Sequence, residues 1–193
     1  MLQPSDLPAG WKATPAAPDP SSAADDAAIV AFLACLGGPN TARNTEGDAV
    51  AEAQSDDFTL GDANVSSSAT SYRSQSAVDP VTAVLHSPKL PSCYEQMAKT
   101  VLAAEMPTGA AIKSASIKIT PGSAGGPANV VASGTATIKL SAYGQQVPVY
   151  VTIAFITGPL TEAEVDTVGI GAPVPASVVN ALVASVATRA AKG

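Results

Sequence analysis

Three segments in the second half of the chain alternate apolar and polar side chains with a period of two residues. They cover residues 114–119, 130–140 and 147–155. Successive side chains of a β-strand point to opposite faces, so this period predicts three half-buried strands. The connections between them are short and rich in Gly and Pro, which favours antiparallel neighbours. A weaker signal over residues 164–170 predicts one more short strand.

The first half of the chain is less regular. Residues 48–54 and 63–74 have a strand-like pattern, and Asp56-Asp57-Phe58 between them is typical of a turn. Helical spacing of apolar residues, together with capping signals, predicts three amphipathic helices and one short one. We expect the first helix after Ser21 or Ser22 as far as Leu36, and the short one from Val81 to His86 behind Asp79-Pro80. A third helix would run to about Glu105, with the capping box Ser92-Cys93-Tyr94-Glu95 at its start and Cys93 in its first turn. The last would follow Pro173-Val174-Pro175 and have Arg189 in its last turn.

The strand pattern leaves one face of the sheet polar, so the helices are expected to cover the other face. We therefore predict a single α+β domain over residues 21–193. It would hold an antiparallel sheet of five to seven strands with about three amphipathic helices packed on one face. Residues 1–20 contain five prolines and predict an extended lead-in, which Leu7 and Trp11 would anchor to the domain.

Composition excludes several classes of function. Hydrophobic residues make up 46% and charged residues 13% of the 193 residues, which is enough to form a core and unlike a disordered chain. The net charge of −6 argues against binding to nucleic acid or to an anionic membrane, since both need a positive field. The longest apolar stretch, residues 27–36, is half the length of a membrane span, so we expect no transmembrane segment. An N-terminal anchor preceding this chain stays open.

Catalytic and metal-binding patterns are weak. A Ser-His-Asp triad would need His86, the single histidine, and no G-x-S-x-G surrounds a serine. The adjacent acid pairs Asp25/Asp26 and Asp56/Asp57 are typical of helix caps and turns rather than of a site with two converging carboxylates. We therefore expect no catalytic residue, no metal and no cofactor.

The two cysteines, Cys35 and Cys93, have two interpretations. In an exported protein they would pair with each other, because there is no third cysteine to compete. In the cytosol they would be two buried thiols. Cys93 at a helix start could also be a reactive thiol, because the helix N-terminus lowers a thiol pKa.

Several short motifs together resemble a family of proteins. They are Asp6-Leu7-Pro8-Ala9-Gly10-Trp11, Ala34-Cys35-Leu36-Gly37, Ser87-Pro88 with Pro91-Ser92-Cys93, and a Val-rich last helix before Arg189. This pattern resembles exported proteins and lipoproteins of actinobacteria, mycobacteria included, several of which have a PsbP-like α–β–α arrangement. The resemblance implies an extracytoplasmic location, secreted or at the cell envelope, and a single disulfide between Cys35 and Cys93. It carries no catalytic residue to this chain.

Three function classes follow as expectations. The first is a non-enzymatic cell-envelope domain that binds a partner protein or a ligand, through a sheet face or through the loop at 121–127. The second is a lipid or glycolipid carrier, since many alanines on core-facing positions could leave an apolar cavity. The third is a hydrolase, which a converging set of perturbed titratable groups in a cleft would favour.

Overall fold

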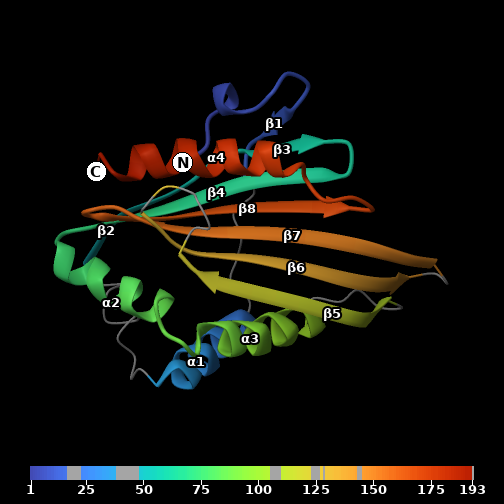
Figure 1. Ribbon diagram of the computed structural model, residues 1–193, viewed down its shortest axis with the longest axis horizontal. Helices are drawn as coiled ribbons and strands as arrows, with labels where there is room; N and C mark the ends of the chain where they lie inside the picture. The colour runs from blue at the N-terminus through green and yellow to red at the C-terminus, as the bar shows by residue number, and fades with distance from the viewer. Residues whose placement is uncertain are drawn as a thin grey trace.

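The structure is a computed structural model, and it describes residues 1–16, 23–37, 48–104, 110–122, 127, 129–142 and 145–192. Within these residues one sheet and four α-helices form the fold (Figure 1). The helices are α1 (Ala23–Leu36), α2 (Gln75–Leu85), α3 (Leu90–Ala104) and α4 (Ala176–Ala190), with a short 3-10 helix at Pro4–Asp6. The strands are β1 (Lys12–Thr14), β2 (Ala49–Gln54), β3 (Asp57–Leu60), β4 (Ala63–Tyr72), β5 (Ala110–Pro121), β6 (Val130–Ala142), β7 (Gln145–Thr157) and β8 (Thr161–Ile170).

The sheet has eight strands in the order β1-β3-β4-β8-β7-β6-β5, and every pairing is antiparallel. β2 and β3 lie end to end along β4, with Ser55 at the junction between them. The three long strands predicted from alternation are β5, β6 and β7, and the predicted α+β class with an antiparallel sheet is confirmed. The strand count is higher than the expected five to seven because β1 joins one edge and because Asp57 and Phe58, predicted to be in a turn, lie in β3.

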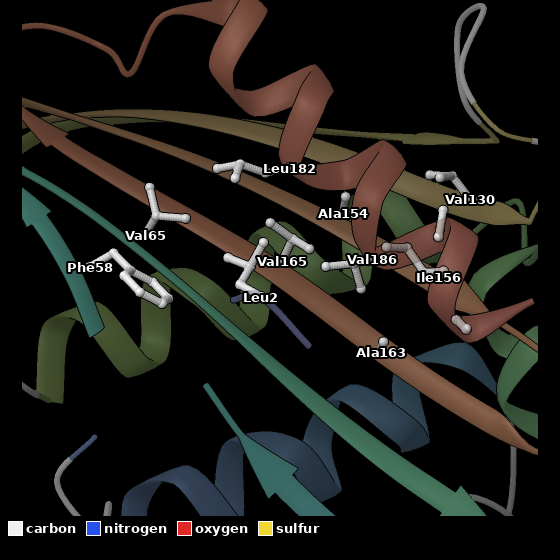
Figure 2. Packing of buried hydrophobic residues seen from close by; sticks show 12 residues of the cluster. Leu2, Phe58, Val65, Val130, Ala154, Ile156, Ala163, Val165, Leu182 and Val186 are labelled. Atoms are coloured by element: carbon white, nitrogen blue, oxygen red, sulfur yellow. The ribbon is translucent and has the colours of Figure 1, made fainter. Parts of the chain in front are cut away.

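Helices cover both faces of the sheet, whereas the sequence predicted helices on one face. Ala154 and Ile156 of β7 pack with Leu182 and Val186 of α4 in one apolar cluster, together with Val165 of β8 (Figure 2). The β7 residues that alternate with them, Ile153 and Phe155, pack in a second cluster with residues of α2 and α3. Alternate residues of one strand therefore meet different helices. We call the two sides the α4 face and the α1–α3 face.

Two helix starts differ from the sequence prediction. α2 begins at Gln75, so Pro80 lies inside the helix instead of opening it behind Asp79. Pro80 costs one backbone hydrogen bond, but burial of Ala77 and Val78 stabilises the turn that precedes it. α3 begins at Leu90, and the Ser92 hydroxyl donates to the Lys89 carbonyl from within the first turn, so Ser92 is not a capping-box residue. Serines 21 and 22, the expected caps of the first helix, lie outside the described residues.

The N-terminal residues pack onto the α4 face. Leu2 is buried in the apolar cluster under α4, and its backbone N–H donates to the Ser67 hydroxyl at 2.7 Å. Asp6 forms a two-pronged ion pair with Arg189 in the last turn of α4. Leu7 and Trp11, the two predicted anchors, both pack against the same cluster. The start of the chain thus covers the sheet on one flank of α4.

The expected disulfide between Cys35 and Cys93 is present and joins α1 to α3 across 58 residues of sequence. Beside it, a column of aromatic rings connects the helices to the sheet. The Tyr94 ring lies edge-on to Phe32 of α1 and to Phe155 of β7, with centroids 6.2 Å apart in both pairs. The disulfide and the ring column hold α1 and α3 together on the α1–α3 face.

The disulfide predicts a large reductant effect on stability. Because it closes a loop of 58 residues, the chain-entropy relation gives a loss of about 4 kcal/mol in the free energy of unfolding when it is removed. Urea unfolding of a Cys35→Ala/Cys93→Ala double variant should show this loss. Reductant should destabilise the wild type by a similar amount and leave the double variant unchanged. Equal urea midpoints for oxidised and reduced wild type would contradict the prediction.

Candidate functional sites

A groove lies on the α4 face between α4 and the strands β5, β6 and β7. Its volume is about 590 Å³, within the range of about 300–1,000 Å³ typical of small-molecule sites. The groove exists because α4 and the N-terminal residues cover β4, β8 and part of β7, and leave the adjoining strands uncovered (Figure 1). We call it the α4 groove; its lining residues are Lys118, Thr120, Pro127, Val130, Ser133, Gly134, Thr135, Thr152, Ile153, Ala154, Val179, Asn180, Val183 and Ala184.

The floor of the α4 groove changes character along its length. At one end Lys118, Thr135 and Thr152 stand in one row across β5, β6 and β7, as Cα partners in the sheet register. At the other end Val130 and Pro127 line the groove. From Val130 to Thr135 the groove follows β6 for roughly 17 Å, at about 3.3 Å per strand residue. Thr120 and Ser133 form the next row of the floor, so the groove is polar at the Lys118 end and becomes apolar near Val130 and Pro127.

On the opposite side of the sheet, β8 carries three carboxyl groups in a row. Glu162, Glu164 and Asp166 alternate with Ala163 and Val165, whose side chains are buried on the α4 face. The three acids, which we call the acidic row, therefore share the α1–α3 face. They are half-buried.

Tyrosines from two elements reach the acidic row. The Tyr72 hydroxyl on β4 donates to Glu162 Oε2 at 3.0 Å. Burial raises the pKa of the Tyr94 phenol on α3, and the nearby charges of Glu164 and Asp166 raise it further. Ser68, the partner of Glu164 on β4, is exposed, so water reaches the row from that side.

The acidic row is electrostatically unfavourable when it is fully ionised. Burial raises the pKa of all three carboxyl groups. The Asp166 charge and a hydrogen bond to Asp166 raise the pKa of Glu164 further, while the same bond partly lowers that of Asp166. Glu164 is therefore the donor, and it holds its proton to a higher pH than a free glutamic acid.

No cation of the described residues neutralises this row. The two ion pairs that the described residues form are Lys99–Glu95 on α3 and Arg189–Asp6 on the other face. The described residues also contain no group of three or more His, Cys, Asp or Glu side chains arranged to hold a metal ion. What the row offers chemically is a carboxyl group, Glu164, that retains its proton to a raised pH beside a second carboxyl group, Asp166.

The catalytic candidates considered from the sequence do not line the α4 groove, whereas Pro127 of the expected contact loop does. His86 is exposed at the C-terminal end of α2, and Asp56 is exposed next to β3. Cys93 is joined to Cys35, which excludes a free thiol there. The side chains of Asp25 and Asp26, and residues 123–126 of the expected contact loop, lie outside the described residues.

Sequence reasoning named a sheet face and the loop at 121–127 as possible contact surfaces, but it did not identify the residues of the α4 groove or the acidic row, although each leaves a trace in the sequence. The acids recur at every second position of a strand whose other positions are small or apolar, which places them on one face. The groove floor is the polar half of the alternation in β5, β6 and β7. Neither pattern by itself reveals which helix covers which face.

A scan against models of known protein families finds no match for this chain, and a search among curated proteins finds no relative. Among the described residues, no helix is both long enough and apolar enough to cross a membrane.

The acidic row predicts that ionisation of Glu164 at neutral pH lowers the stability of the fold. A carboxyl group whose folded pKa is raised stabilises the fold below its unfolded pKa, and this contribution is lost as pH rises through the folded pKa. Glu164→Gln keeps the hydrogen-bond donor and removes the charge. Urea unfolding should show the variant to be more stable than wild type at pH 7 by on the order of 1 kcal/mol, and equal to it near pH 4.

Glu95→Gln, on the exposed surface of α3, serves as the control for the same chemical change. It should leave the difference between pH 4 and pH 7 within experimental error of wild type. A Glu164→Gln variant that is less stable than wild type at pH 7 would show that the ionised carboxylate stabilises the fold.

Proposed function

We propose that this protein is a non-enzymatic binding domain of the cell envelope, and that the α4 groove holds its ligand. The observation that carries the proposal is the groove itself: a cavity of about 590 Å³ with a polar end and an apolar end beside a helix. An apolar lining with a few converging polar groups is the usual form of a small-molecule site.

An extracytoplasmic location is part of the same proposal. The Cys35–Cys93 disulfide supports it, because disulfides form and persist in oxidising compartments. The resemblance to actinobacterial secreted proteins and lipoproteins, with their PsbP-like arrangement, points in the same direction. In such a setting the domain would present its groove to a ligand or partner at the cell surface.

A second candidate function is hydrolysis at the acidic row. The observation that favours it is the pairing of Glu164 with Asp166, since a general acid and a general base with separated proton affinities are what such a reaction needs. The two tyrosines beside the row would orient a substrate oxygen. The row lies on the opposite face of the sheet from the α4 groove, so the two candidates are separable by mutation.

The groove proposal is tested by filling the groove. Ala184→Phe places a ring at the α4 wall, whereas Ala181→Phe adds the same ring at an exposed position of α4 outside the groove. After incubation with a small-molecule extract of a bacterial envelope, native mass spectrometry should show a bound compound on wild type and on Ala181→Phe. The same spectrum from Ala184→Phe should lack it. An adduct retained by Ala184→Phe would place the binding elsewhere.

The hydrolase candidate is tested with a panel of chromogenic esters and glycosides. It predicts turnover that falls at least about 100-fold in Glu164→Gln, a loss typical of removing a general acid, while Glu95→Gln keeps the wild-type rate. Circular dichroism checks that both variants are folded. Turnover that is absent from wild type, or unchanged in Glu164→Gln, removes this candidate.

A further inference from the structure

The sheet separates charge between its two faces. All three acids of β8 point to the α1–α3 face. Lys118 of β5 and Lys139 of β6 both lie on the α4 face, with the groove floor. Lys118 is the register partner of Thr135, and Lys139 is paired with Ser114, which lies on the same face of β5 as Lys118. The described α4-face positions of these three strands, and the whole of α4, contain no Asp or Glu. In a chain with a net charge of −6, the α4 groove is thus a local region free of negative side chains.

The polar end of the groove has the form of an anion site. Lys118, Thr135 and Thr152 are neighbours across three adjacent strands, about 4.8 Å apart from one strand to the next. They offer one ammonium group and two hydroxyl donors to the same volume. Lys118 forms neither of the two ion pairs found among the described residues, so its charge is available to a ligand. Asn180 of α4 adds an amide at the groove wall.

The other end of the groove is suited to a chain of methylene groups. Val130 and Pro127 line it from the sheet side, and Val183 and Ala184 line it from α4. None of the described residues that line the groove is aromatic, so among them a flat ring or a sugar has no side chain to stack on. An alkyl chain needs only apolar area, and burying it gains roughly 0.8 kcal/mol per methylene group.

We propose that the α4 groove binds an anionic amphiphile, with its phosphate or carboxylate headgroup on the Lys118–Thr135–Thr152 row and a single alkyl chain along Val130 and Val183. This inference rests on the proposed function and names its ligand class. It also gives the carrier hypothesis a specific form, in which the headgroup is charged rather than a neutral sugar.

The test compares three probes by titration calorimetry below their micelle concentrations: dodecyl phosphate, dodecyl glucoside and inorganic phosphate. Dodecyl phosphate should bind most tightly, since only it fills both ends of the groove. Lys118→Met should weaken its binding about tenfold or more, because a charge-assisted hydrogen bond is lost. Lys139→Met removes the same charge from the same face outside the groove and should change the affinity less than about twofold, as expected of a screened charge.

The outcomes separate the ligand class from the binding function. If dodecyl glucoside binds as tightly as dodecyl phosphate, and Ala184→Phe but not Lys118→Met removes both, the groove is a binding site and the anionic class is wrong. If inorganic phosphate binds as tightly as dodecyl phosphate, the alkyl chain contributes nothing and the amphiphile is wrong. If Lys118→Met and Lys139→Met lower the affinity for dodecyl phosphate equally, the attraction comes from nonspecific charge and the proposal is overturned. Dodecyl phosphate that does not bind at all overturns it as well.

Discussion

Side-chain alternation in β8, held in register between β4 and β7, decides what each side of the sheet can do. Val165 is paired with Ala154 on one neighbour and with Ser67 on the other, and all three point toward α4. Glu164 and Asp166 necessarily point the other way. A slip of one residue would place these carboxyl groups under α4 and expose the apolar ones. The central strand is therefore both the anchor of the main core and the source of the acidic row.

The position of α4 follows from how closely it can approach this strand. Small residues, Ala154 and Ala163, lie beneath it. Gly158, directly after β7, allows close contact with the backbone at the end of α4, and Gly169 of β8 allows close contact with Ala172 in the segment that leads to α4. A Cβ atom at Gly158 would lie 1.9 Å from the Ala190 carbonyl oxygen, so no other residue fits there without moving the helix end. Because α4 is drawn toward β8 in this way, it cannot also cover β5 and β6. The groove is the part of the sheet that the helix leaves uncovered.

On the α1–α3 face, stabilising and destabilising interactions occur side by side. The disulfide and the Phe32–Tyr94–Phe155 ring column secure α1 and α3, while the neighbouring acids lower stability when they ionise. Partly buried carboxyl groups without a cation are unfavourable for folding, and such local conflicts tend to occur where a protein has a function to perform. The free energy that the disulfide contributes offsets part of the electrostatic cost of the acids.

The sequence determined the local structure, because a period of two residues and a period near four are properties of neighbouring positions. The strands β5, β6 and β7 and the ends of α1 and α4 were predictable for this reason. So was the packing of Leu7 and Trp11, since large apolar side chains in a Pro-rich segment have few other partners. Pro80 inside α2 and Phe58 inside β3 were mispredicted, because burial against distant strands outweighed the local turn and cap signals.

Tertiary structure alone decided which face each helix covers and which side chains meet. The Lys118–Thr135–Thr152 row joins three strands and the tyrosines of the acidic row come from β4 and α3, so both depend on register and packing between segments far apart in the chain. Alternation in a strand defines two sides and does not say which of them a helix will occupy. The free energy of packing α4 against small residues of β7 and β8 determines which face this helix covers. The position of the groove follows from it.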